Sequence, residues 1–293
     1  MSNGFNAKNK WGLVIGDIML DKYISGVAKR LSPEAPVPII NVNENVNKIG
    51  GAGNVALNLL SLGIKTILIG EIGSDNSGEV LKDLLRDNGI TSKHLIKKRG
   101  LTTTKTRIMS GQQQMVRLDY DELSTGPNQT ELKKILKLIS TGPSAIIISD
   151  YEKGFLTPTF LKQVIQSANK KNIPILIDPK GTDIEKYRGA TAITPNKKEA
   201  LILANLTNND DQLLNASLKK IIKEYNFNFI AMTQGDLGIK HITKNKVEDY
   251  PSTTSKEVFD VSGAGDTVIA TLAASMIANT SLEDAFRLAN FSA

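Results

Sequence analysis

The residues best suited to chemistry lie near the end of the chain, in the segment DVSGAGD at residues 260–266. A run with helical spacing follows it, so its two glycines would expose successive backbone N–H groups at the positive end of a helix dipole. Such a helix start suits a phosphoryl group in transfer. We therefore predict Gly263, Ala264 and Gly265 as an anion hole, with Asp266 orienting and deprotonating an acceptor hydroxyl.

Asp266 has a second interpretation, because an acidic residue in the first turn of a helix is also an ordinary cap. The dipole is expected to stabilise the charged carboxylate, which would keep Asp266 ionised at neutral pH and only weakly basic. A weak base is sufficient where the transition state is loose and the proton leaves late.

A second glycine cluster, GGAGN at residues 50–54, precedes a helical run. It is explained by a turn with an N-cap, and it also imitates a dinucleotide fingerprint with Glu71 about 20 residues further on. That fingerprint requires a buried strand before its first glycine, whereas residues 43–48 are the polar NENVNK. A nicotinamide-dependent dehydrogenase is therefore the disfavoured alternative.

Asn196 and Glu199 follow a predicted strand and lie one helical turn apart, which points both side chains the same way. Together they could hold a hydrated Mg²⁺ beside nucleotide phosphates, or they could simply cap the helix. Lys180, in the segment DPKG, could reach a phosphate as a point charge. The loop that begins Thr233-x-Gly235 also ends a strand, and a hairpin turn explains it equally well.

The elements that must position these residues alternate along the chain. Strand-length apolar runs occur at 12–15, 66–69, 145–149, 174–177, 192–194 and 229–233, and helical patterns at 54–62, 78–88, 129–139 and 158–171. Such alternation predicts an α/β fold with a doubly wound, mainly parallel sheet. Ligands bind outside the carboxyl ends of such strands, so the polar strand ends should gather along one edge.

Two segments depart from this alternation. Residues 36–46 and 102–118 alternate apolar and polar side chains without a helical period, which predicts antiparallel strands of a small separate sheet. Because they lie far apart in the sequence, they would form a flap on the core.

Composition excludes several classes of protein. The chain of 293 residues has 36 Lys and Arg, 30 Asp and Glu, two His and no Cys. Disulfides, thiolate nucleophiles and sulfur-ligated zinc are therefore excluded, and His94 and His241 are predicted at the surface. The lysines are scattered and aromatic residues are few, which argues against nucleic acid as a partner. No secretory leader or membrane span is found, so we expect a cytoplasmic protein without a membrane partner.

Taken in order, these motifs resemble the ribokinase-like (PfkB) carbohydrate kinases over nearly the whole chain. Further segments resemble the heptose-7-phosphate kinases within that family: GDIMLD at 16–21, SPEAPVP at 32–38, QQMVRLD at 113–119, SDYEKG at 149–154 and DPKGTD at 178–183. The resemblance implies a ribokinase-like fold over residues 1–293, with a β-sheet lid at about 21–49 and 101–122. It implies ATP-dependent phosphorylation of D-glycero-β-D-manno-heptose 7-phosphate at its anomeric hydroxyl, on the route to ADP-heptose for the lipopolysaccharide core.

The resemblance also implies roles for individual residues. Asp266 would be the catalytic base, and Glu199 would bind Mg²⁺ through water. The residues that would face ATP are Lys180, Asn196, Lys197, Lys198, Glu199, Thr233 and Gly235. Those that would bind the sugar hydroxyls are Asp17, Asp21, Gly51 and Asn54. Arg107 and Arg117, on the lid strands, are predicted to hold the sugar phosphate, because Arg can contact a phosphate through two N–H groups. A monovalent cation is a further candidate cofactor.

The family's lids clasp each other, so a homodimer is expected. The chain departs from the family at Glu152, where heptose kinases usually have Gly, and it ends at Ala293, where the family continues with a further strand and helix. The nucleotidyltransferase part of bifunctional relatives is absent from the sequence. The alternatives are a kinase of another sugar, such as ribose or fructose, or a non-catalytic sensor of nucleotide or sugar phosphate.

Overall fold

The computed structural model describes residues 8–252 and 263–292, and an eight-stranded sheet forms its centre. The strand order is β14-β13-β12-β11-β10-β9-β1-β4. These strands span Trp11–Gly16 (β1), Lys65–Ile69 (β4), Ala145–Ser149 (β9), Ile175–Asp178 (β10), Ala192–Ile193 (β11), Phe229–Thr233 (β12), Ile239–Thr243 (β13) and Val247–Tyr250 (β14). The pairs from β4 through β12 are parallel, and the pairs β12–β13 and β13–β14 are antiparallel. This confirms the predicted mainly parallel sheet.

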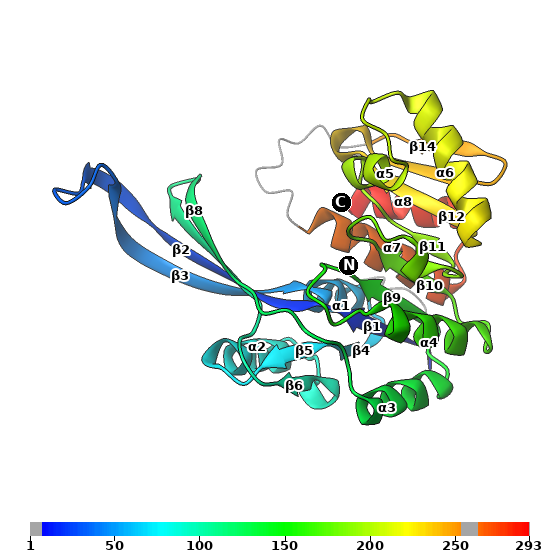
Figure 1. Cartoon of the computed structure of the whole chain (residues 1–293), viewed down its shortest axis with the longest axis horizontal. Helices are drawn as coiled ribbons and strands as arrows, with labels where there is room; N and C mark the ends of the chain where they lie inside the picture. Colours follow the sequence, from blue (N-terminus) through cyan, green and yellow to red (C-terminus); the bar gives the residue numbers. More distant parts are fainter. Residues whose placement is uncertain (1–7, 253–262, 293) are drawn as a thin grey trace.

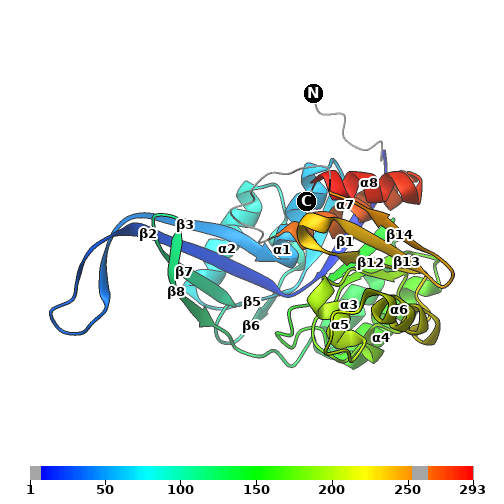
Figure 2. The ribbon, with the colours of Figure 1, turned by 90° about the horizontal axis from the view of Figure 1, so that it is seen from above.

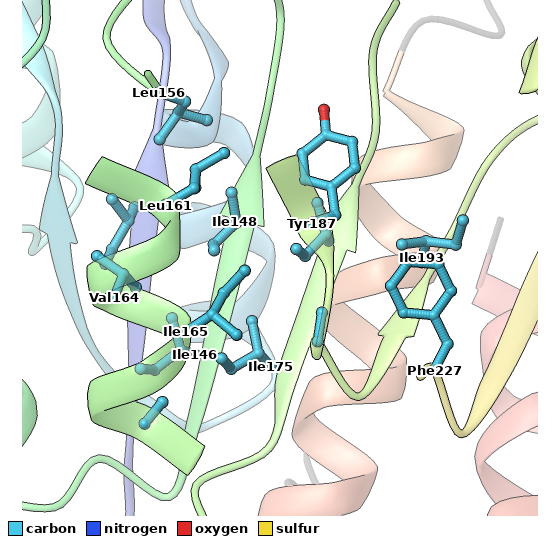
Figure 3. Close-up of a cluster of buried hydrophobic side chains, with 14 of the residues drawn as sticks. Ile146, Ile148, Leu156, Leu161, Val164, Ile165, Ile175, Tyr187, Ile193 and Phe227 are labelled. Atoms are coloured by element: carbon cyan, nitrogen blue, oxygen red, sulfur yellow. The ribbon is translucent and has the colours of Figure 1, made fainter. Parts of the chain in front are cut away.

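Helices cover both faces of this sheet (Figures 1 and 2). They are α1 (Ala52–Ser61), α2 (Asn76–Asp87), α3 (Gln129–Ser140), α4 (Pro158–Asn169), α5 (Lys197–Leu203), α6 (Asp211–Tyr225), α7 (Ala264–Ala278) and α8 (Leu282–Ser292), with 3₁₀ turns at Ser92–His94 (η1), Glu185–Tyr187 (η2) and Gly235–Leu237 (η3). Successive residues of β1 face opposite layers, so Leu13 and Ile15 join the core under α3, α4 and α6, while Val14 joins the core under α1, α7 and α8. Figure 3 shows the first of these cores, where α4 packs its apolar side chains on β9 and β10.

A second, four-stranded sheet extends away from the core (Figure 1). Its order is β3-β2-β7-β8, with β2 at Ile18–Leu31, β3 at Pro38–Gly51, β7 at Thr104–Ser110 and β8 at Gln113–Tyr120. We call these four strands the projecting sheet. The predicted separate sheet is present, but it is mixed and not purely antiparallel, because β2 and β7 both run outward from the core and pair in parallel.

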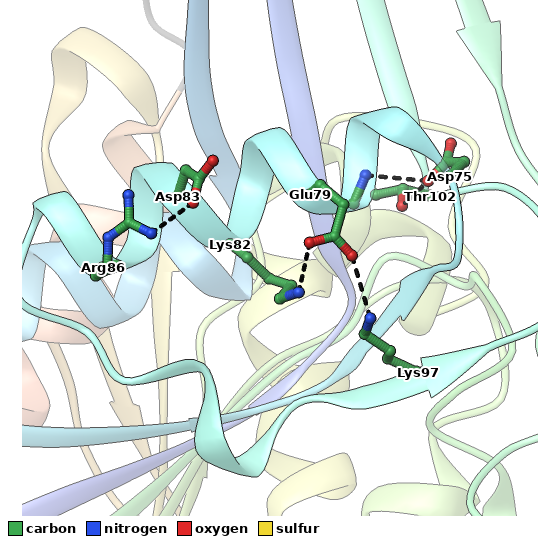
Figure 4. Close-up of polar contacts among 8 residues, drawn as sticks. Asp75, Glu79, Lys82, Asp83, Arg86, Lys97 and Thr102 are labelled. Atoms are coloured by element: carbon green, nitrogen blue, oxygen red, sulfur yellow. Dashed lines mark hydrogen bonds and ion pairs between the residues drawn. The ribbon is translucent and has the colours of Figure 1, made fainter.

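A hydrogen bond joins the start of helix α2 to the segment that leads into β7. Asp75 caps α2 by accepting the N–H of Gly78 at 3.0 Å, and the same carboxylate oxygen accepts the hydroxyl of Thr102 (Figure 4). Glu79 pairs with Lys82 and with Lys97 of the short pair β5 (Glu71–Gly73) and β6 (Ile96–Lys98). These contacts hold the inner end of the projecting sheet against the core.

The prediction that both histidines lie at the surface is wrong. His241 is 7% exposed, and its ring lies 4.4 Å from that of Phe286 and 5.4 Å from that of Phe229. The alternation of β13 places it on the same inward face as Ile239, and His94 is partly buried as well. Among the described residues, no helix combines the length and the apolar character that a bilayer span requires.

Candidate active site at the carboxyl ends of the strands

Polar residues gather where the parallel strands end, as the sequence predicts. The strand ends are joined through the backbone: Asp17 donates its N–H to the carbonyl of Ser149, and Asp150 donates its N–H to the carbonyl of Asp178, both at 3.1 Å. An isolated parallel bridge likewise joins Asn196 to Thr233. Residues from five strands therefore share one edge of the sheet.

Helix α7 begins at this edge. Gly263 is its N-cap, with φ of 93°, and as a glycine it offers no side chain to cap the helix. The first i→i−4 hydrogen bond runs from the N–H of Thr267 to the carbonyl of Gly263, so the N–H groups of Ala264, Gly265 and Asp266 have no acceptor within the helix. Among residues 8–252 and 263–292, a Cβ added to Gly265 would meet no atom within 4 Å. The rest of the motif, residues 260–262, lies outside the described residues.

Asp266 is 5% exposed, and both of its carboxylate oxygens are engaged. Asn54 Nδ2 donates to Oδ2 at 2.7 Å, and the Tyr151 hydroxyl donates to Oδ1 at 3.3 Å. Burial raises the pKa of Asp266 to about 6, despite these two donors. The expectation of a weakly basic carboxylate therefore needs correction, because the loss of water around the group outweighs the stabilisation of its charge.

The start of α1 positions Asn54, the side chain that donates to this carboxylate. Gly51 is the N-cap of α1 with φ of 59°, and a Cβ there would lie 2.3 Å from the carbonyl oxygen of Asp17. The position therefore requires glycine. It lets α1 start beside β1, and Asn54 then reaches Asp266 one turn into the helix. The direct contact of Asn54 is the carboxylate of Asp266, and its binding to sugar stays a prediction.

Asp17 is buried, and its partners differ from those of Asp266. Its Oδ2 accepts the backbone N–H groups of Tyr151 at 2.8 Å and of Lys153 at 3.2 Å. Burial raises the pKa of Asp17 to about 6, and the neighbouring charge of Asp150 adds to the shift. The observed contacts therefore make Asp17 an anchor of the loop after β9, while its predicted contact with sugar stays a prediction.

Cations from the projecting sheet approach the same place. Arg107 Nη1 lies 2.6 Å from Asp21 Oδ1, with both side chains largely buried. Lys105 lies over the ring of Tyr151, 5.3 Å from its centroid. Burial lowers the pKa of Lys105. The charge of Asp21 opposes this shift, and the cations Lys153, Arg107 and Arg117 add to it. Four positive charges thus lie close together, although Arg117 is half exposed and already contacts Asp119 at 2.8 Å.

On the other side of the edge, Asn196 and Glu199 form a capping box. Asn196 Oδ1 accepts the N–H of Glu199 at 3.0 Å, and Glu199 Oε2 accepts the N–H of Asn196 at 2.9 Å. Glu199 Oε1 lies 2.7 Å from Lys180 Nζ. Of the other two residues of this motif, Lys197 pairs with Asp211 at 2.9 Å, and the side chain of Lys198 is exposed. The capping alternative is thus realised, and the contact with ATP stays a prediction.

The loop after Thr233 is a hairpin turn between β12 and β13. Gly235 and Gly238 adopt φ of 60° and 91°, which explains the glycines. A Cβ on Gly235 would meet no atom of the described residues within 4 Å. Both interpretations of the motif are compatible with this geometry.

Asp178 belongs to the site although the sequence singled out only its neighbour Lys180. Burial raises the pKa of Asp178 well above its usual range, and the charges of Asp266 and Glu199 raise it further. No group of three or more metal-ligating side chains is found among residues 8–252 and 263–292. A divalent cation would nevertheless relieve this crowding of carboxylates, with phosphate oxygens and water completing its ligands. The residues therefore fit a magnesium–nucleotide complex.

The departure at Glu152 has a visible backbone consequence. Glu152 has φ of 55°, in the left-handed region where glycine is favoured. Its N–H donates to Asp150 Oδ1 at 2.8 Å, while Asp150 Oδ2 accepts the Tyr187 hydroxyl at 2.8 Å and contacts Lys186. The loop thus keeps the conformation suited to glycine at the cost of local strain.

Comparison with known proteins was made with this geometry in view. The profile of the pfkB family of carbohydrate kinases matches residues 12–293. Bifunctional protein HldE of Methylobacillus flagellatus is 42% identical over 287 residues, which cover 97% of this chain and 59% of that protein. The protein of the same name from Geobacter sulfurreducens is 39% identical over 284 residues, 96% of this chain and 58% of that protein. The chain spans about three fifths of the length of these relatives.

Two solved structures are similar in fold. Ribokinase of Arabidopsis thaliana, complexed with ribose and ATP, superposes with a TM-score of 0.76 at 17% identity, covering 96% of this chain and 90% of that one. Phosphofructokinase-2 of Escherichia coli, in complex with fructose-6-phosphate, gives 0.77 at 19% identity, covering 96% and 91%. The predictions of a ribokinase-like fold and of a carbohydrate kinase are confirmed, and the dehydrogenase is disfavoured.

Proposed function

The chain belongs to the pfkB family of carbohydrate kinases, and from this premise we propose that it phosphorylates D-glycero-β-D-manno-heptose 7-phosphate. The reaction transfers the γ-phosphoryl group of ATP to the anomeric C1 hydroxyl and gives the 1,7-bisphosphate. The observation that carries the proposal is the buried carboxylate of Asp266 in the first turn of α7, whose N-cap is the glycine Gly263. The heptose-kinase motifs and the relatives named HldE support the choice of sugar, which belongs to ADP-heptose and lipopolysaccharide synthesis in the cytoplasm.

Asp266 provides the base in this scheme. Its Oδ2 is held by Asn54 at 2.7 Å, whereas within the part of the chain that the structure describes Oδ1 accepts only the long 3.3 Å hydrogen bond from Tyr151. Oδ1 is therefore the oxygen that takes the proton of the acceptor hydroxyl. The backbone N–H groups of Ala264 and Gly265 stabilise the charge on the phosphoryl group as it moves in line from ATP to the sugar.

The nucleotide would lie beside the strand ends that carry Asn196, Thr233 and Gly235. Bound Mg²⁺ neutralises the charge on the phosphates of ATP. Glu199 and Asp178 would face that ion through water, with Lys180 beside the phosphates as a point charge. We keep a monovalent cation as a candidate cofactor on the strength of the family resemblance alone.

The cations of the projecting sheet support a phosphorylated sugar. Lys105, Arg107 and Arg117 come from this sheet, and Lys153 from the loop after β9. Burial is the main cause that lowers the pKa of Lys105, the charge of Asp21 opposes it, and the three other cations add to it. An anion placed among these cations would reduce their mutual repulsion. The projecting sheet would act as the lid that covers the sugar and excludes water.

The projecting sheet also exposes apolar side chains that suit a second copy of this chain. Those at least one third exposed are Val27, Leu31, Val42, Met115, Val116, Leu118 and Tyr120. Exposed apolar patches mark interaction sites. We therefore expect a homodimer joined through this sheet, and a monomeric mass by light scattering at micromolar concentration would contradict it.

A substrate panel tests the proposal. The protein is given Mg²⁺–ATP with heptose 7-phosphate, free heptose, fructose 6-phosphate, fructose or ribose, and ADP release is followed by a coupled assay, with ³¹P NMR to locate the new phosphate. We expect kcat/KM for heptose 7-phosphate to exceed that of each other sugar by at least about 100-fold. A higher value for ribose or a fructose would assign another sugar. Binding of ATP without turnover on any sugar would favour a non-catalytic sensor.

A further inference from the structure

Tyr151 contacts three parts of the active site. Its backbone N–H donates to Asp17 Oδ2 at 2.8 Å, and its hydroxyl donates to Asp266 Oδ1 at 3.3 Å. Its ring lies below the ammonium group of Lys105 on β7, 5.3 Å from the centroid.

We propose that Tyr151 is a positioning residue for phosphoryl transfer, whose hydroxyl fixes the carboxylate of Asp266 so that Oδ1 faces the acceptor hydroxyl. This inference rests on the proposed function and adds to it the residue that aims the base. Tyr151 neither takes the proton nor touches the phosphoryl group in this account.

The geometry of the two donors carries the argument. The terminal torsion of an aspartate side chain is broad, so one hydrogen bond leaves the carboxylate plane free to turn. Asn54 holds Oδ2 from α1 and Tyr151 holds Oδ1 from the loop after β9, which fixes the plane from both sides. The bond from Tyr151 is long for O–H···O, and each carboxylate oxygen can accept more than one donor, so Oδ1 keeps room for the substrate hydroxyl.

The loop that carries Tyr151 is itself rigidly held. Asp17 accepts the N–H groups of both Tyr151 and Lys153, and Asp150 accepts the N–H of Glu152 between them. Both acceptors are buried, at 4% and 3% exposure. Three successive backbone N–H groups are thus bound to two buried carboxylates, which fixes the position of the Tyr151 backbone.

The surroundings keep the Tyr151 hydroxyl a donor. Burial and the charge of Asp266 raise the pKa of Tyr151, so the hydroxyl stays protonated across the working pH range. The ring contact with Lys105 adds a second anchor, because a cation over an aromatic face is attracted by its quadrupole. The tyrosine therefore also links the projecting sheet to the base.

Replacing Tyr151 by Phe tests the proposal, because Phe keeps the ring and its contact with Lys105 and removes only the hydroxyl. We expect kcat to fall about tenfold, with KM for the sugar within about twofold. The acidic limb of the kcat profile should move to higher pH by about half a unit to one unit, because the lost hydrogen bond favoured the charged form of Asp266.

Tyr187→Phe is the matched control, since it removes another buried tyrosine hydroxyl, one that donates to Asp150 and not to Asp266. It should leave the acidic limb where it is in the unmodified protein. A limb that moves equally in both variants would overturn the proposal, as would a Tyr151→Phe enzyme whose kcat and pH profile match those of the unmodified protein.

A readout independent of turnover separates this inference from the proposed function. Carboxyl ¹³C NMR of Asp-labelled protein, with the Asp266 signal assigned through Asp266→Asn, measures the titration of the carboxylate directly. We expect Tyr151→Phe to raise the midpoint and Tyr187→Phe to leave it unchanged. If no sugar is phosphorylated but the midpoint rises, the contact stands and the proposed function fails; an unmoved midpoint overturns the positioning role whatever the substrate.

Discussion

Asp17 and Asp266 are two buried carboxylates at one edge of the same sheet, and the regions around them differ in the hydrogen-bond donors that they supply. Burial raises the pKa of both to about 6. Asp17, after β1, binds two backbone N–H groups and holds a loop in place. Asp266, at the start of α7, is held by two side chains and lies beside N–H groups that the helix leaves unpaired. The raised pKa does not distinguish the two carboxylates, and their partners do, which is why we propose Asp266 and not Asp17 as the base.

Activity should separate the two carboxylates most strongly. Asp266→Asn removes the base, and we expect kcat to fall by about 10³, with the Kd for ATP, measured by calorimetry, within a few-fold. Asp17→Asn keeps a carbonyl oxygen for both N–H groups, and we expect it to lose no more than about tenfold in kcat. Equal losses in the two variants would remove the distinction between anchor and base.

Truncation at Asp17 should affect stability more than chemistry. Asp17→Ala leaves the N–H groups of Tyr151 and Lys153 without their acceptor, which should lower the free energy of unfolding by about 3 kcal/mol relative to Asp17→Asn. Urea unfolding measures this loss. Asp17→Asn, which retains an acceptor, is the control, and an Ala variant as stable as the Asn variant would show that the anchor contributes little.

Stability should respond to pH in the same direction at both positions. Above about pH 6 both carboxylates are charged in the folded protein, and the cost of burying that charge is present; below about pH 4 they are protonated in both states and the cost vanishes. Asp266→Asn and Asp17→Asn should each raise the free energy of unfolding at pH 8 by about 2 kcal/mol. The gain should disappear at pH 4, and a gain that is unchanged at pH 4 would contradict burial as its cause.

The smallest effect is expected at Glu152, in the loop that Asp17 anchors. Glu152→Gly removes a side chain from a position with φ of 55° and should raise the free energy of unfolding by about 1 kcal/mol. Chemical denaturation measures the change, with Glu152→Ala as the control that keeps a Cβ and so keeps most of the strain. A destabilised Gly variant would show that the Glu side chain contributes more than its backbone costs.

The sequence predicted the sheet and helices well because their signals are local. Residues 145–149 and 229–233 appear as strands β9 and β12 within the predicted limits, since buried parallel strands are continuous apolar runs. The strand pairing of the projecting sheet is harder to predict from the sequence. The parallel pairing of β2 with β7 depends on where the chain leaves and re-enters the core, and no local pattern encodes it.

The site was only partly predictable, because its key contacts are long-range. Asn54 and Asp266 are 212 positions apart, and Tyr151 and Asp266 are 115 apart, so no spacing rule could pair them. The spacing of Asn196 and Glu199 fits a capping box and a metal site equally well, and the sequence alone left that choice open. His241 was assigned to the surface because its neighbours in sequence are polar, whereas its neighbours in space are aromatic.

The central claim is that the carboxylate of Asp266 takes the proton of the acceptor hydroxyl. The most direct measurement is the single-turnover rate of phosphoryl transfer, followed by chemical quench from pH 5 to pH 8 with ATP and heptose 7-phosphate already bound. We expect the rate to fall about tenfold for each pH unit below about 6, because protonated Asp266 cannot act, and to be low and flat in Asp266→Asn. A flat profile in the unmodified protein, or an Asp266→Asn rate within tenfold of it, would contradict the account.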